Sequence, residues 1–208
     1  DSFYTAVNQG LDALLDLDGI TLVIGHPVKI GQERFNAATV MRDGHRLGQY
    51  HKMLLPNDEV FDECRYFTPG AAPLVVEVAG TQVGILICED MWHVEPAAEA
   101  ADAGAECLLV LNASPFHLGK SAEREQTLRE RVAETGLPLI YAHMVGGQDE
   151  VVFEGRSFAL NANGAVAGRA PGFKENLFVA HAQSAQGAIE LVANVAPVPS
   201  AEADLWDA

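Results

Sequence analysis

The chain has 208 residues, of which 49% are hydrophobic and 20% are charged, and its formal net charge at pH 7 is −16. A chain of this length can bury one sizeable hydrophobic core. The strong negative charge argues against a nucleic-acid partner, which would require a basic face, and no apolar run reaches the roughly 20 residues that cross a bilayer.

Short apolar segments separated by turn signals predict an alternation of helices and strands. The expected elements, in chain order, are a helix over 2–15, strands over 20–25, 35–42 and 45–50, a long loop over 53–72, strands over 74–78 and 81–88, a helix over 96–103, a strand over 107–111, a helix over 120–135, and strands over 139–145, 151–160 (broken near Gly155), 165–169 and 188–192. The dipeptide Asp43-Gly44 is a strong hairpin signal. A loop as long as the one over 53–72 is often functional.

Hairpins interrupt the alternation of strands and helices, which indicates an α/β fold with mixed sheets and helices on the outer faces. We expect one domain over residues 1–196. The tail over 197–208 is acidic and rich in proline and alanine, and we interpret it as a linker, or as the start of an element that is cut short.

The three cysteines, Cys64, Cys88 and Cys107, lack CxxC spacing. A disulfide framework or a zinc site is therefore not expected, and reduced thiols favour a cytoplasmic protein. Cys88 follows a buried apolar run that reads as a strand and precedes two carboxylates. It is a candidate nucleophile, and the alternative is a small core residue at the end of a strand.

Lys52 offers an ammonium group upstream of this cysteine. A buried ammonium group stabilises a thiolate, or the oxyanion that forms when a thiolate attacks a carbonyl. The alternative is a surface lysine at the end of a strand.

Several sequence blocks between about residue 50 and residue 160 carry a resemblance to a known family. They are YHK at 50–52, VFDE at 60–63, RYFTPG at 65–70, ICEDMW at 87–92, NASPFHLGK at 112–120 and VGGQDE at 145–150. In this order they resemble the carbon–nitrogen hydrolase (nitrilase) superfamily, and more narrowly the glutaminase domain of glutamine-dependent NAD synthetases. The resemblance implies a four-layer α-β-β-α sandwich with two mixed sheets.

The resemblance also implies roles for four residues of the reaction centre. Cys88 would be the nucleophile, Lys52 and the backbone N–H of Glu89 would stabilise the oxyanion, and Glu63 would be a second carboxylate that holds Lys52 and the substrate. The glutaminase step would need no cofactor and no metal.

Three further residues match substrate-contacting positions of the synthetase branch. Ser114 and Lys120 would bind glutamine, Lys120 by meeting its α-carboxylate. The alternatives are a turn residue and a plain lysine at the start of a helix. Asp58 stands where the branch often has a tyrosine that stacks on the substrate, which leaves the details of glutamine recognition open.

Two expected parts of the family pattern are not found in the chain. The general-base glutamate would lie about sixty to seventy residues before Lys52, so we expect the first strand and this glutamate to be missing. Nothing resembles the C-terminal synthetase domain, which uses ATP and Mg, and no glycine-rich phosphate loop is present.

The resemblance therefore predicts a glutamine amidohydrolase that releases ammonia for NAD synthesis, with the synthetase domain as its partner, and an incomplete domain of little activity on its own. One alternative is a free-standing amidase or carbamoylase acting on a small amide. The other is a non-catalytic binding module. The family also leads us to expect a homo-oligomer.

Overall fold

The structure, a computed structural model, describes residues 2–57, 61–185 and 187–208. Its helical elements are α1 (Ser2–Leu14), η1 (Glu63–Arg65), η2 (Cys88–Trp92), α2 (Val94–Asp102), α3 (Lys120–Thr135) and α4 (Ala201–Asp207). Its strands are β1 (Thr21–Ile30), β2 (Glu33–Arg42), β3 (His45–His51), β4 (Leu74–Val78), β5 (Thr81–Ile87), β6 (Cys107–Asn112), β7 (Leu139–His143), β8 (Val145–Gln148), β9 (Val151–Glu154), β10 (Phe158–Leu160), β11 (Val166–Arg169), β12 (Ala180–Ala185) and β13 (Ala188–Ala193).

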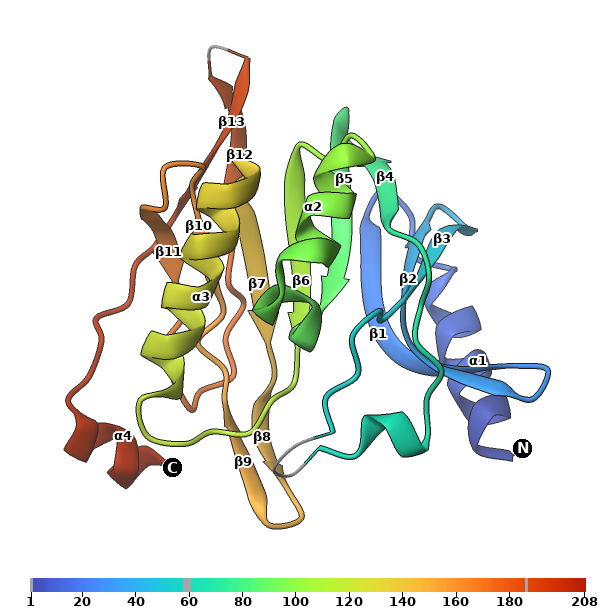
Figure 1. Cartoon of the computed structure of the whole chain (residues 1–208), viewed down its shortest axis with the longest axis horizontal. Helices are drawn as coiled ribbons and strands as arrows, with labels where there is room; N and C mark the ends of the chain where they lie inside the picture. Colours follow the sequence, from blue (N-terminus) through green and yellow to red (C-terminus); the bar gives the residue numbers. More distant parts are fainter. Residues whose placement is uncertain (1, 58–60, 186) are drawn as a thin grey trace.

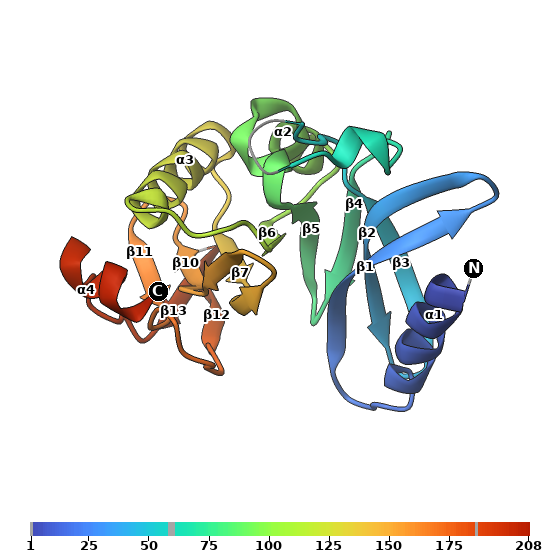
Figure 2. The ribbon, with the colours of Figure 1, turned by 90° about the horizontal axis from the view of Figure 1, so that it is seen from below.

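Two sheets form the centre of the molecule, and helices cover their outer faces (Figure 2). One is an antiparallel sheet of β1, β2 and β3, against which α1 packs, and the other is a six-stranded mixed sheet in the order β11-β10-β7-β6-β5-β4. Helices α2 and α3 lie side by side on the six-stranded sheet (Figure 1). The expected α/β class and its four-layer arrangement are confirmed, with the six-stranded sheet as the mixed one.

The parallel part of the six-stranded sheet positions the candidate site. Strands β5, β6 and β7 run parallel to one another, and β5 is buried over most of its length because its residues 83–87 are all apolar or glycine. Parallel strands end at the same edge of a sheet, and α/β proteins bind ligands beyond that edge. The residues that follow these strands therefore meet in one place.

Several expected elements agree with the observed ones within a few residues, among them α1, the β2–β3 and β4–β5 hairpins and α3. Strand β1 continues to Ile30, past the expected end at residue 25. Pro27 is tolerated there because β1 is the outer strand of its sheet, where a missing N–H removes no ladder bond.

The C-terminal third differs more from expectation. The strand expected over 139–145 is divided into β7 and β8. The break expected near Gly155 in the strand over 151–160 is confirmed, since it separates β9 from β10 and Gly155 has a φ of +68°. Strand β12 was not expected, and α4 lies inside the range interpreted as a linker. The domain boundaries at 1–196 and 197–208 stay a prediction.

Candidate active site

Cys88 directly follows β5 and is the first residue of the short helix η2, where the chain turns. Its backbone φ is +47°, a left-handed conformation that is uncommon for a residue with a side chain and that surrounding contacts must hold in place. Such strained positions occur most often at functional sites. The thiol is buried, with 8% of the residue exposed, and it borders a cavity.

A buried carboxylate, Asp90, holds this turn against the segment that carries Lys52. One Asp90 oxygen accepts hydrogen bonds from the backbone N–H groups of Met53 (3.1 Å) and Leu54 (2.9 Å). The other accepts from the Tyr50 hydroxyl (2.8 Å) and the Ile87 N–H (3.0 Å). Burial raises the pKa of Asp90, and these hydrogen bonds together with nearby Lys52 oppose the rise.

Lys52 forms a buried ion pair with Glu63. The Lys52 Nζ donates to both carboxylate oxygens, at 2.9 Å and 2.8 Å, and 1% of the lysine side chain is exposed against 18% of the glutamate. Asn36 Nδ2 also donates to Glu63, at 3.4 Å. The expected link between Lys52 and Glu63 is therefore present, and it fixes the ammonium group at the cavity wall.

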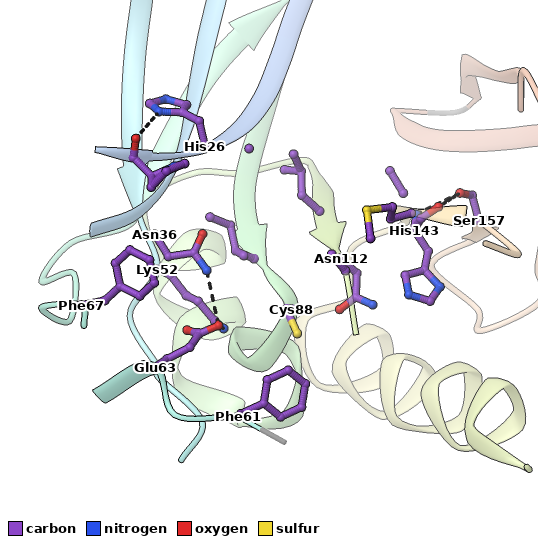
Figure 3. Close-up of a pocket in the computed structure, with 17 residues that line it drawn as sticks. His26, Asn36, Lys52, Phe61, Glu63, Phe67, Cys88, Asn112, His143 and Ser157 are labelled. Atoms are coloured by element: carbon purple, nitrogen blue, oxygen red, sulfur yellow. Dashed lines mark hydrogen bonds and ion pairs between the residues drawn. The ribbon is translucent and has the colours of Figure 1, made fainter. Parts of the chain in front are cut away.

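Cys88, Lys52 and Glu63 line one cavity of about 600 Å³. Figure 3 shows Lys52 and Glu63 together, with Phe61 and Phe67 nearby, and Cys88 between this pair and Asn112. The cavity is further lined by residues of β1, by the ends of β6 and β7 and by Ser157: Gly25, His26, Pro27, Leu111, Asn112, Ala113, Ala142, His143, Met144 and Ser157.

Burial raises the pKa of the Cys88 thiol to about 11, with Lys52 lowering it and the carboxylates of Glu89 and Glu63 raising it further. The resting side chain is consequently a thiol at neutral pH, and nucleophilic attack requires a base to remove its proton.

We predict that alkylation of Cys88 by iodoacetamide accelerates about tenfold per pH unit between about pH 7 and pH 9, because the reactive thiolate fraction grows with pH until the pKa is reached. The rate is measured by mass spectrometry of the Cys88 peptide. Cys107, whose pKa burial raises to about 12, is the internal control and should react more slowly. A plateau for Cys88 below pH 8 would contradict the raised pKa.

A second cavity, of about 250 Å³, also borders Cys88. Ser114 and Lys120 line it, together with Glu89 and Trp92. The Lys120 Nζ lies 4.1 Å from the centre of the Trp92 ring, a cation–π distance, and 3.1 Å from Glu123. An ammonium group and carboxylates therefore face this cavity together.

The sequence-predicted residues thus fall on the two cavities that share Cys88. Lys52 and Glu63 lie on the larger one, and Ser114, Lys120 and Glu89 on the smaller one. The side chain of Glu89 meets His93 at 3.3 Å, and the role of its N–H stays a prediction. Asp58 lies outside the residues that the structure describes.

Sequence reasoning missed the residues that hold the site. Asp90 was read only as part of a motif, although a carboxylate directly after a buried strand is a visible signal. His143 ends β7, and its ring nitrogens lie 2.7 Å from the Gly155 carbonyl oxygen and 3.0 Å from that of Ser114. No feature of the sequence near His143 indicates these contacts, which arise from tertiary packing.

In the part of the chain described, no helix combines the length and hydrophobicity needed to cross a membrane. No group of three or more histidine, cysteine or acidic side chains within residues 2–57, 61–185 and 187–208 is arranged to hold a metal ion.

Comparison with known sequences places the chain among relatives that are longer than itself. Residues 3–188 match the carbon-nitrogen hydrolase family. A glutamine-dependent NAD(+) synthetase from Acinetobacter baylyi is 44% identical over 174 residues, which are 83% of this chain and 32% of that protein. One from Rhodobacter capsulatus is 41% identical over 189 residues, 91% of this chain and 34% of that protein. The chain therefore spans about a third of the length of these relatives.

Solved structures of similar fold include the same kinds of protein. The glutamine-dependent NAD+ synthetase from Acinetobacter baumannii, in complex with ADP, superposes with a TM-score of 0.91 at 37% identity, covering 98% of this chain and 39% of that one. A mutant amidase from Nesterenkonia sp. AN1 has a TM-score of 0.72 at 29% identity, covering 81% of this chain and 63% of that one. In that amidase structure the acetamide moiety of fluoroacetamide is covalently added at the active-site cysteine.

Proposed function

Because the chain belongs to the carbon–nitrogen hydrolase family, we propose that it hydrolyses the side-chain amide of glutamine and releases ammonia. The observation that carries the proposal is the Cys88 thiol at a strained turn, beside the buried Lys52–Glu63 pair on one cavity and the Lys120 ammonium on the next. The relatives that cover most of this chain are named for glutamine.

The proposed reaction runs through a thioester on Cys88. A base takes the thiol proton, and the thiolate attacks the amide carbon of glutamine. The negative charge that develops on the carbonyl oxygen is stabilised by the Lys52 ammonium and the Glu89 N–H. Collapse of this intermediate breaks the C–N bond, and the base returns its proton to the departing ammonia. Water then hydrolyses the thioester and frees glutamate.

The two carboxylate roles are assigned to different residues. Glu63 already accepts two hydrogen bonds from Lys52, which suits it to hold the ammonium group in place. We assign the proton transfer to the separate glutamate that the family resemblance calls for. General-base catalysis contributes about 10²- to 10⁴-fold to a reaction rate. The rate therefore depends strongly on this general-base glutamate, which is separate from Glu63.

The small cavity is proposed to hold the amino-acid end of glutamine. Lys120 would meet the α-carboxylate and Ser114 would donate a hydrogen bond, while Glu89 and Glu123 face the same cavity and suit the α-ammonium group. A neutral small amide offers no charged group for this ammonium and these carboxylates to bind, which favours an amino-acid amide.

The longer relatives are named as glutamine-dependent NAD(+) synthetases. We propose that the ammonia released here likewise serves NAD(+) synthesis, with a ligase domain that uses ATP and Mg as the partner. A cytoplasmic location and a homo-oligomer stay predictions.

Trapping the acylated cysteine tests the proposal. We expect glutamine, added to the full-length protein and quenched in acid, to leave a γ-glutamyl group on the Cys88 peptide and none on the Cys107 peptide, as read by mass spectrometry. Acylation by acetamide or butyramide but not by glutamine would support a small-amide amidase instead. No acylation by any of these amides would mean that the chain is not catalytic.

A further inference from the structure

A continuous series of polar contacts begins at Ser114, on the wall of the small cavity. Its hydroxyl oxygen accepts hydrogen bonds from Arg124 Nη2 (2.8 Å) and Asn112 Nδ2 (2.8 Å). The same Arg124 nitrogen also donates to the carbonyl oxygens of Ser114 (3.2 Å) and Pro115 (3.0 Å). Both lone pairs of the hydroxyl are thus engaged, and its hydrogen is left for an acceptor, either the hydrogen-bonded Tyr141 or a substrate oxygen.

Arg124 is itself held by a buried carboxylate, that of Glu154. Its Nη1 pairs with Glu154, and both residues are almost fully buried, at 2% and 0% exposure. The Ser121 hydroxyl donates to the same Glu154 oxygen, at 2.9 Å. Buried pairs of this kind add little net stability, but they fix the positions of the groups they contain.

The contacts continue from Ser121 to the C-terminal helix α4. Arg156 Nη1 donates to the Ser121 hydroxyl (3.2 Å) and to Asp204 of α4 (3.0 Å), and its Nη2 pairs with the other Asp204 oxygen. Gly172 lies directly against the guanidinium, because a Cβ at this position would come within 2.6 Å of Arg156 Nε. The arginine is thereby confined between Phe173, Gly172 and α4.

We propose that this series, from Asp204 through Arg156, Ser121, Glu154 and Arg124, is a positioning unit for Ser114. It makes α4 a part of the substrate-binding half of the site, although α4 contributes no residue to either cavity that Cys88 borders. The inference rests on the proposed glutamine hydrolysis, since Ser114 matters to the extent that the small cavity binds the amino-acid end of a substrate.

The physical reason is that each link holds the next in one orientation. If Asp204 is lost, the buried Arg156 guanidinium loses its charge partner and is free to reorient towards Ser121 and Glu154. Glu154 then no longer presents the same oxygen to Arg124, and the Ser114 loop loses three hydrogen bonds that fix its position. Substitutions along such contiguous networks change coupled binding by about 2- to 30-fold.

The test compares two electrophilic reagents that alkylate Cys88 in the full-length protein. A chloroketone analogue of glutamine requires the amino-acid pocket, whereas iodoacetamide requires only an accessible thiol. We expect Asp204→Ala to weaken binding of the analogue, which raises the analogue concentration for half-maximal inactivation by about 2- to 30-fold. The maximal inactivation rate and the iodoacetamide rate should not change. Asp207→Ala, an exposed aspartate of the same helix, is the matched control and should behave like the unaltered protein.

Ser121→Ala provides a second variant, since it interrupts the series between the two ion pairs and removes no charge. Ser121→Ala should weaken binding of the analogue in the same way if the series acts as a unit. Equal response of Asp204→Ala and Asp207→Ala to the analogue, or an iodoacetamide rate that falls in parallel, would overturn the positioning role. If the unaltered protein does not react with the analogue faster than with iodoacetamide, the proposed glutamine function itself has failed.

Discussion

Replacing Cys88 with alanine is expected to abolish ammonia release from glutamine, with a loss in kcat on the order of 10⁶-fold, as for other enzymes that lose their nucleophile. The reason lies in the described residues that line the two cavities: besides Cys88, the nucleophile candidates there include a serine, Ser114, whose lone pairs are engaged and an ion-paired lysine, Lys52, and neither is expected to form the acyl intermediate. The measurement is steady-state ammonia production by the full-length protein.

The control for this substitution is Cys107→Ala, which removes a buried thiol of β6 that borders neither cavity. It should retain near-normal activity. NAD synthesis driven by added ammonia should persist in Cys88→Ala, because it bypasses the thioester. If glutamine-driven synthesis survives in Cys88→Ala, the assignment of the nucleophile is wrong.

Replacing Lys52 with methionine should lower kcat by about 10²- to 10³-fold, the usual cost of removing one oxyanion-stabilising donor. Methionine keeps most of the volume of the lysine side chain, so packing changes little. Two effects add: the oxyanion loses its buried ammonium group, and the pKa of the Cys88 thiol rises because Lys52 is the group that chiefly lowers it. The KM for glutamine should change less than kcat.

Lys174→Met is the matched control, since Lys174 is exposed and distant in sequence from the site. A second readout separates catalysis from folding, because the Lys52 substitution also leaves Glu63 without its ion partner. The iodoacetamide rate of Cys88 should fall at neutral pH and recover at higher pH, whereas a misfolded protein would show a faster, exposed cysteine at every pH. Unchanged kcat in Lys52→Met would exclude Lys52 from the oxyanion site.

The sequence predicts the reacting residues better than the residues that hold them. Cys88 and Lys52 lie in short motifs that indicate a nucleophile and an oxyanion-stabilising ammonium group. The apolar run before Cys88 shows where its strand ends. The pairing of Lys52 with Glu63 was expected from the family resemblance, and the ion pair is present. The placement of Lys120 over Trp92 was not expected, since these two residues lie 28 positions apart and meet only through the packing of η2 against α3.

The supporting contacts could not be predicted because they join distant segments. Arg124 and Glu154 read as ordinary charged residues of a polar helix and a strand, and only the fold buries them together. Strand β12 was missed for a different reason: its sequence, AHAQSA, lacks the β-branched and aromatic residues that favour strands, although it pairs with the adjacent β13 in a hairpin.

The four hydrogen bonds that Asp90 accepts have a practical consequence for anyone who assays this protein. They join the turn that carries Cys88 to the segment that carries Lys52, so we expect disruption of one to disturb the other. Reactivity towards a glutamine-like reagent therefore also reports on structural integrity. A preparation that has lost its tertiary structure around β3 and β5 should not react, and partial activity should reflect the fraction of correctly folded molecules.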